Sequence, residues 1–375
     1  MSIPQPAINP SWIVRPLRNE DLNGVAELAR AVYGKSALTD VSYLDWKFNR
    51  NPSGKAIVAV CDCQGQIIGV AGLFPQVFKI GSSVWRGAWG GDVMVHPHFR
   101  RHGIFIAVMG AVFEWAARDV AFAYTTRSRK SPPIRGVFKY FEIITPGGIF
   151  ARTKCIRILP TIGALSVSLE PTLTSLMQHA GTIRELISFA PVENLTNNSG
   201  FPAPFSRDES IRVRKLDSLV LGEEFEKLWQ EVKDSLPIAV VKDRTYLNWR
   251  YANPTGRYIG FRAEKNGALC GYALLAFTMR RRLKTAWVAE LLAVNPEVAI
   301  ELVEACLECA RQEHAHIFKM WETKETRALA GRLGFKKTWH KEPIIVHVLD
   351  SNLPENLVGN IDNWCINFGD TEDWM

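Results

Sequence analysis

Residues 92–105 read DVMVHPHFRRHGIF and join the end of a predicted strand to the start of an amphipathic helix. A junction of this kind directs the unpaired N–H groups of the first helical turn, and the positive end of the helix dipole, at one spot. Arg100 and Arg101 add positive charge there, and Gly103 permits a close approach of the backbone or an otherwise disfavoured dihedral angle. The stretch predicts a phosphate or pyrophosphate site, although Arg-x-x-Gly at a helix start equally occurs as a plain solvated turn.

The chain contains an internal repeat. Residues 43–54 read YLDWKFNRNPSG and residues 246–256 read YLNWRYANPTG, while the Val-x-Pro of residues 95–97 recurs at residues 294–296. Because the landmarks keep nearly the same spacing in both halves, we expect two copies of one fold. The expected segments are an N-terminal domain over residues 1–158, a turn-rich linker with one helix over residues 159–210, and a C-terminal domain over residues 211–375.

Both copies share one order of predicted elements. Apolar periodicity predicts, in the first copy, strands at 12–17, 56–61, 67–77, 85–95 and 120–125, and helices at 22–32, 103–118 and 133–141. In the second copy it predicts strands at 211–216, 258–263, 268–279, 283–294 and 317–321, and helices at 223–233, 297–313 and 326–333. The fold class is therefore α/β or α+β, with two tandem mixed sheets that are mostly antiparallel and flanked by helices.

Composition excludes several classes of protein. Of the 375 residues 47% are hydrophobic and 22% are charged, and no apolar run is long enough to span a membrane, so a globular chain without a membrane partner is expected. The N-terminus has no signal-peptide pattern, and seven cysteines suit reduced thiols, which favours the cytoplasm. The cysteine spacing predicts no metal site. The net charge of +7 suits a phosphate-rich cofactor, and the short basic runs argue against nucleic acid as the main partner.

The order of strand, Val-x-Pro, Arg-x-x-Gly and amphipathic helix, after a meander and before a strand and a short aromatic helix, resembles the GNAT superfamily of acyl-CoA-dependent N-acyltransferases. The resemblance covers residues 12 to about 157 and, more faintly, 211 to about 348. It implies two tandem GNAT-like folds and acetyl-CoA, or another acyl-CoA, as co-substrate. The implied pyrophosphate-binding residues are Arg100, Arg101, His102, Gly103, Ile104 and Phe105, the last of which replaces a small residue of the family signature.

The resemblance also implies roles for residues outside the loop. Val93, Met94 and Val95 would splay from the neighbouring strand and contact the pantetheine arm, and Ser131 stands where the family often has a CoA-contacting Asn.

The acid and base are less clearly marked. Phe138 occupies the position of the family's usual Tyr acid, so Tyr140 or Tyr124 would have to serve. Acyl transfer to an amine needs a donor for the oxyanion and an acceptor for the amine proton. Asp92 is the best candidate for that acceptor, although a residue after Gly90 and Gly91 is equally a bulge or turn residue.

The second copy lacks the phosphate-binding features. Its loop has neither Arg nor Gly, and Glu297 and Glu301 would repel a pyrophosphate. Glu290, before the loop, is either a structural carboxylate or a residue that reaches a groove between the copies. The aromatic residues of the repeated motif, Trp46 and Trp249, either pack its short helix or line an acceptor site.

The sequence thus predicts transfer of an acetyl or other acyl group from acyl-CoA to a primary amine of a small molecule, such as an amino sugar, with the first copy active and the second degenerate. Two alternatives stay open: a non-catalytic CoA-binding scaffold and a tRNA-dependent aminoacyl transferase. A homodimer also stays open.

Overall fold

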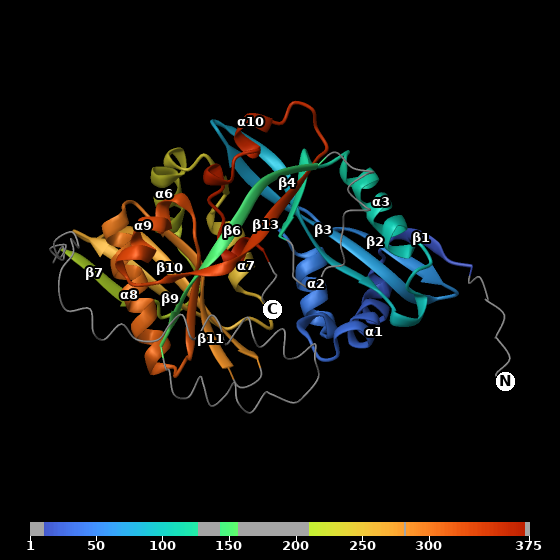
Figure 1. Cartoon of the computed structure of the whole chain (residues 1–375), viewed down its shortest axis with the longest axis horizontal. Helices are drawn as coiled ribbons and strands as arrows, with labels where there is room; N and C mark the ends of the chain where they lie inside the picture. The colour runs from blue at the N-terminus through green and yellow to red at the C-terminus, as the bar shows by residue number, and fades with distance from the viewer. Residues whose placement is uncertain (1–10, 127–142, 157–209, 281–282, 372–375) are drawn as a thin grey trace.

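The computed structural model describes residues 11–126, 143–156, 210–280 and 283–371. Its elements form two sets, from blue to red in Figure 1, whose order is the same except that β8 and α9 are described only in the second. The first set is β1 (Ile13–Pro16), α1 (Leu22–Tyr33), α2 (Val41–Asn49), β2 (Ile57–Cys63), β3 (Gln66–Ile80), β4 (Ser83–Val95), α3 (Ile104–Ala116), β5 (Phe122–Thr126) and β6 (Ile143–Cys155). The second set is β7 (Ile211–Lys215), α6 (Glu223–Val232), β8 (Ile238–Val240), α7 (Arg244–Tyr251), β9 (Tyr258–Lys265), β10 (Ala268–Arg280), β11 (Leu283–Ala293), α8 (Pro296–Gln312), β12 (Ile317–Trp321), α9 (Lys324–Arg332) and β13 (Lys336–Val348).

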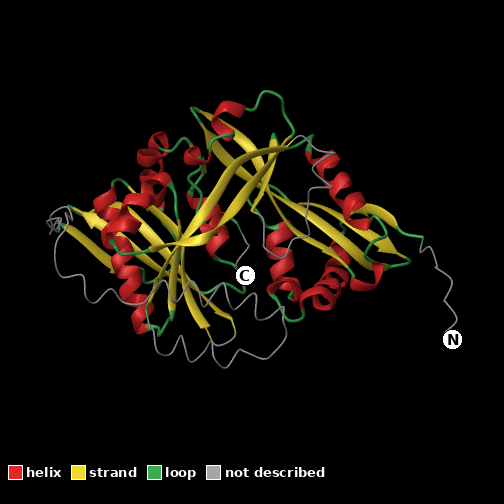
Figure 2. Cartoon of the chain, in the orientation of Figure 1, coloured by secondary structure: helices red, strands yellow, loops and turns green. Residues whose placement is uncertain are grey.

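A C-terminal tail comes after β13 and contains the short helices α10 (Glu355–Val358) and η8 (Phe368–Asp370). The predicted fold class, two α/β units of mixed sheet flanked by helices, is confirmed, although the strands of the two units join in one sheet (Figure 2). The helices predicted over residues 133–141 and in the linker lie outside the described residues. None of the described helices is long and apolar enough to cross a membrane.

Helices cover both faces of the first meander. Strands β1 to β4 pair antiparallel, and successive residues of a strand point to opposite faces of the sheet. Val58 and Val60 of β2 therefore share a core with α1 and α2, whereas Ala59 and Cys61 share another with α3. This sandwich holds the end of β4, where the predicted loop begins, between two layers of helices.

The two copies exchange strands. Strand β6 comes after the first copy in the chain but pairs with β12 of the second, and β13 ends the second copy but pairs with β5 of the first. The two exchanged strands also pair with each other, and they cross the middle of the molecule in Figure 1. As a result, the described strands form one continuous sheet in the order β1-β2-β3-β4-β5-β13-β6-β12-β11-β10-β9-β7, with β8 paired to β3.

The repeated aromatic motif lies where the copies meet. Helices α2 and α7 bring Trp46 and Trp249 into a stack with ring centroids 4.9 Å apart. The indole Nε1 of Trp46 donates to the carbonyl oxygen of Trp249 at 3.1 Å, and that of Trp249 donates to the carbonyl oxygen of Trp46 at 3.3 Å. Each motif thus packs against its own repeat, an arrangement with local two-fold character, and this supports the packing interpretation of the motif.

Candidate functional site

The loop between β4 and α3 has a backbone that prepares it for an anion. After a single turn of 3-10 helix, Pro97–Phe99, both Arg101 and Gly103 adopt left-handed dihedrals with φ of 69° and 76°. Helix α3 then begins at Ile104 without a side-chain cap, so the N–H groups of its first turn are left for another partner. A Cβ at Gly103 would meet no atom within 4 Å, so this position favours glycine for its dihedral angle rather than for lack of space.

The side chains of the loop form an exposed cationic rim. Arg100, Arg101 and His102 are exposed. The Nε of Arg100 donates to the carbonyl oxygen of Val95 at 3.4 Å, and Nδ1 of His102 lies 2.9 Å from the carbonyl oxygen of Arg100. Partial burial lowers the pKa of His96, and neighbouring His98 and Arg100 lower it further, which favours the neutral form of its ring. The permanent positive charge of the loop therefore comes from its arginines.

Strand β4 separates from β5 just before this loop. The two strands pair in parallel from Gly87–Phe122 to Trp89–Tyr124, and β4 then continues to Val95. On its other edge β4 still pairs with β3, through Met94 and Val95. Among the described residues, the pairing with β5 thus ends before Val93, Met94 and Val95, for which the resemblance implies a splay.

Asp92 lies at a bulge in this splayed part of β4. Asp92 and Val93 together face one residue of β3, and Asp92 has a φ of 54°, which side chains other than glycine rarely adopt. Its Oδ2 lies 2.7 Å from Nζ of Lys47, and the two side chains are 8% and 2% exposed. The alternative interpretation, a bulge residue, is therefore correct as geometry, and it coincides with a buried ion pair that the sequence did not reveal.

Lys47 comes from α2 and is surrounded by aromatic rings. Its Nζ lies 4.2 Å from the ring centroid of Phe74 and 5.1 Å from that of Trp89. Tyr33, at the end of α1, is a further group that sequence reasoning missed. Although 54% of Tyr33 is exposed, desolvation at its hydroxyl raises its pKa, and the Asp92 carboxylate raises it further. The positive charges of Arg100 and Lys47 act in the opposite direction and lower the pKa of Tyr33, so these groups lie near one another at one end of β4.

The other predicted residues of this site have different outcomes. Tyr140, Ser131 and Phe138 lie outside the described residues. Tyr124 is 1% exposed, and its hydroxyl donates to Oε1 of Gln76 at 2.8 Å and to the carbonyl oxygen of Asp370 at 2.9 Å. Because its proton is engaged inside the core, Tyr124 is a poor candidate for the acid.

The second copy has the same separation of strands, and a side chain of the protein fills the gap between them. Strands β11 and β12 pair from Thr285–Ile317 to Trp287–Lys319, as many residues as in the first copy, and then separate. The C-terminal tail places Phe368 in this gap, with its ring centroid 4.3 Å from that of Trp287 and 4.6 Å from that of Trp321. Helix α8 carries its own cap, because the side chain of Asn295 accepts from the N–H of Val298. The segment equivalent to the phosphate loop is thus already satisfied.

A buried polar cluster binds the C-terminal tail to the second copy. Lys242 is paired with Glu290, at 2.8 Å, and with Asp370. Tyr251 donates to Glu290 at 2.8 Å, and Asn367 of the tail donates to its other oxygen. These contacts, and the complete burial of Glu290, identify it as a structural carboxylate.

Burial also shifts the protonation of this cluster. It raises the pKa of Glu290 to about 7 despite the opposing effect of Lys242, and the Asp370 carboxylate adds to the rise. For Lys242, burial acts to lower the pKa, but Asp370 and Glu290 outweigh it and raise the pKa above its ordinary value. One ammonium is thus shared by two carboxylates in the core.

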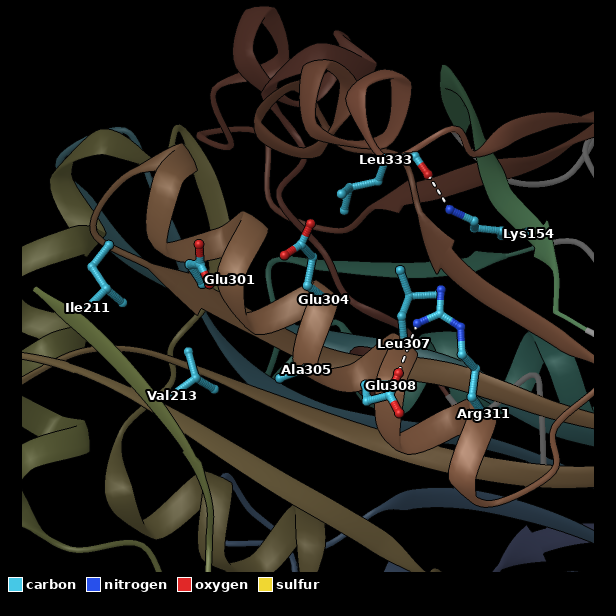
Figure 3. Close-up of a pocket in the computed structure, with 10 residues that line it drawn as sticks. All are labelled: Lys154, Ile211, Val213, Glu301, Glu304, Ala305, Leu307, Glu308, Arg311 and Leu333. Carbon is cyan, nitrogen blue, oxygen red and sulfur yellow. Dashed lines mark hydrogen bonds and ion pairs between the residues drawn. The ribbon is translucent and has the colours of Figure 1, made fainter. Parts of the chain in front are cut away.

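Two hollows lie in the second copy. One, of about 290 Å³, lies beside the tail and is lined mainly by apolar residues near the end of β11. The other, of about 660 Å³, lies between α8 and β7, where Glu301, Glu304 and Glu308 line it (Figure 3). In this hollow Arg311 donates a hydrogen bond to Glu308, and Lys154 donates one to the carbonyl oxygen of Leu333. The lining contains no residue of the 96–103 loop. Within the described ranges, no group of three His, Cys, Asp or Glu residues could hold a metal ion.

Comparisons with known proteins found a matching domain family and several similar folds. Residues 13–133 match the family model of an acetyltransferase (GNAT) domain. The fold is similar to a GCN5-related N-acetyltransferase from Anabaena variabilis, with 10% identity and a TM-score of 0.59 over 93% of this chain and 75% of that one. A GCN5-related N-acetyltransferase from Kribbella flavida gives 12% identity and a TM-score of 0.57 over 95% and 75%.

A tandem GNAT protein from the clavulanic acid biosynthesis pathway gives 15% identity and a TM-score of 0.55 over 90% of this chain and 99% of that one. At these identities the solved structures show likeness of fold alone. No curated protein matches the sequence.

Proposed function

We propose that the first copy, whose residues 13–133 match the model of a GNAT acetyltransferase domain, transfers an acyl group, acetyl in the first instance, from acyl-CoA to a primary amine of a small molecule. The observation that carries the proposal is the sequence of features along β4: the splay after Trp89, then the left-handed Arg101 and Gly103, then a helix without a side-chain cap. The second copy keeps the splay but fills it with its own chain.

The residues present fit an acyl-CoA. The N–H groups at the start of α3, with Arg100 and Arg101, would hold the pyrophosphate, and Gly103 keeps the left-handed turn that presents those groups. The splayed edge of Val93 to Val95 would bind the pantetheine amides and orient the thioester. Acyl-CoA itself supplies the activated carbonyl carbon.

The reaction needs a proton acceptor, a proton donor and a group that stabilises the negative charge on the carbonyl oxygen. The neutral amine attacks the thioester carbon, the new C–N bond forms as the C–S bond breaks, the amine releases a proton and the departing thiolate takes one up. We assign the proton acceptor to Asp92, directly or through water, and keep Tyr140 as the donor to the thiolate. Backbone N–H groups of β4 would stabilise the negative charge on the carbonyl oxygen.

The acceptor class rests on architecture. A site beside a second copy of the fold is more enclosed than one on a single domain, which favours a small amine, such as an amino sugar, over a protein. Six of the seven cysteines are unpaired thiols, which supports a reducing compartment such as the cytoplasm.

A calorimetric titration with acetyl-CoA tests the proposal. We expect one site per chain, loss of binding in Gly103→Glu because a carboxylate and a strained dihedral enter the loop, and binding at least ~10-fold weaker in Arg100→Ala. Asn295→Ala, which alters the equivalent loop of the second copy, is the matched control and should bind as the wild type does.

Two results would change the proposal. Absence of binding by acetyl-CoA and longer acyl-CoAs would remove the acyltransferase assignment. Binding without turnover across a panel of amines would favour the CoA-binding scaffold.

A further inference from the structure

The ion pair between Lys47 and Asp92 is confined to the copy that has the phosphate loop. In the repeat, Arg250 takes the place of Lys47, and its Nε donates to the carbonyl oxygen of Gly369 in the tail. Asp92 comes three residues after Trp89, the last residue of β4 that pairs with β5, and the second copy has a buried carboxylate, Glu290, three residues after the equivalent Trp287. The ion-pair partner of Glu290 is Lys242, which precedes the motif helix α7. A cation at this position of the motif and a buried carboxylate on the splayed strand are thus common to both copies, and in the first copy the motif's own cation contacts that carboxylate at 2.7 Å. Packing of the motif alone does not account for the pair.

The surroundings of the pair set the charge of Asp92. Among the described residues, Lys47 from α2 contacts the Asp92 carboxylate, and Tyr33 from α1 interacts with it electrostatically; Lys47 is the buried one of the two. Aromatic rings of Phe74 and Trp89 exclude water from the ammonium. A buried ammonium at 2.7 Å strongly favours the anionic form of a carboxylate, and the bulge fixes where that anion lies.

We propose that Lys47 is a positioning residue of the acyl-transfer reaction: it holds the Asp92 carboxylate, as an anion, at the bulge where β4 leaves β5, so that Asp92 can receive the proton of the acceptor amine. This inference rests on the proposed function. It assigns a role in the reaction to a residue that the repeated motif alone marks as structural. It also explains why a lysine lies among the buried, mostly apolar residues of α2.

Two measurements on Lys47→Met test the inference, one with and one without turnover. In the pH profile of kcat for acetyl transfer, the acidic limb should move to higher pH by about 1 unit or more, because Asp92 without its cation gains a proton more readily. The KM for acetyl-CoA should stay within about 2-fold, since the 96–103 loop is untouched. Lys47→Arg, which keeps the charge, should restore the wild-type limb.

The second measurement is thermal unfolding from pH 5 to pH 8. The Tm of Lys47→Met should lie below that of the wild type by roughly 5 °C or more at pH 8, and the deficit should shrink towards pH 5. Linkage sets the sign: an unpaired buried carboxyl group has a raised folded pKa, so its penalty is relieved when it is protonated. Arg250→Met is the matched control, because it removes the equivalent cation of the second copy and should not move the acidic limb.

The outcomes separate this inference from the proposed function. A deficit in Tm that is the same at every pH, or an acidic limb that stays in place, would overturn the role of Lys47 even if the enzyme is active. A pH-dependent deficit in a protein that acylates no amine would support Lys47 as the holder of the anion and remove the acyltransferase function. If Lys47→Met does not fold, Asp92→Asn decides: acetyl transfer at the wild-type rate would overturn the inference, and loss of kcat with intact acetyl-CoA binding would support it.

Discussion

The two copies of the fold use the same splayed strands for opposite purposes. In the first copy, β4 leaves β5 after Trp89, and the strand continues into a carboxylate at a bulge, an arginine loop and an uncapped helix. In the second copy, β11 leaves β12 after Trp287, and the gap holds a ring of the protein's own tail beside a helix that caps itself.

Under the proposed function, the difference shows how the second copy keeps the fold without binding a ligand. A gap between splayed strands exposes apolar surface and backbone groups, so a copy without a ligand has to fill it in another way. The tail does so with Phe368, and the buried carboxylate Glu290 is matched by Lys242 rather than left to a substrate. The carboxylate charge in the second copy is thus balanced by a lysine of the protein itself.

The largest effect that tests this contrast is expected for Lys242→Met. The substitution leaves Glu290 and Asp370 buried together without their shared ammonium, which should cost about 3–5 kcal/mol of unfolding free energy. Urea unfolding would measure the loss, with exposed Lys227→Met as a control within about 0.5 kcal/mol of the wild type. Where the variant stays folded, its affinity for acetyl-CoA should be unchanged, and a loss of about 10-fold would show that the two sites are not independent.

A smaller effect is expected from pH, through Glu290. Its folded pKa, about 7, lies above the ordinary value of 4.5, so its contribution to stability is fully present below pH 4.5 and is lost as the pH rises through 7. Between pH 5 and pH 8 the wild type should lose on the order of 1–3 kcal/mol relative to Glu290→Gln, which does not titrate. Paired urea curves at each pH isolate this group from the histidines. Parallel stability profiles for the two proteins would mean that Glu290 stays charged throughout.

The sequence predicted the features that depend on neighbours along the chain. The left-handed turn at Gly103, the start of α3 and the repeated motif are local, and short stretches of sequence are enough to predict them. The exchange of β6 and β13 was not predicted, because it depends on pairing between strands that are far apart in the chain.

The ion pair and the tail were missed for the same reason. Lys47 and Asp92 meet only through the packing of α2 on β4, although a lysine in an apolar motif that carries Arg250 in its repeat was a signal of a buried cation. The tail gave no such signal, since Phe368 and Asp370 acquire partners only when the second copy has formed.

The smallest expected effect concerns the symmetry of the contact itself. If the two motifs are equivalent in packing, Trp46→Phe and Trp249→Phe each remove one indole hydrogen bond to the opposite helix and should cost similar amounts, about 1 kcal/mol. The double variant should cost less than the sum, because the two bonds share one pair of stacked rings and the loss of either loosens the other. Urea unfolding of the two single variants and the double variant would measure these costs, with Trp12→Phe beside the edge strand β1 as a control. Unequal costs would show that the two copies already differ in the contact between α2 and α7. Equal costs would confine their difference to the ends of β4 and β11, where one copy has an arginine loop and the other has the tail.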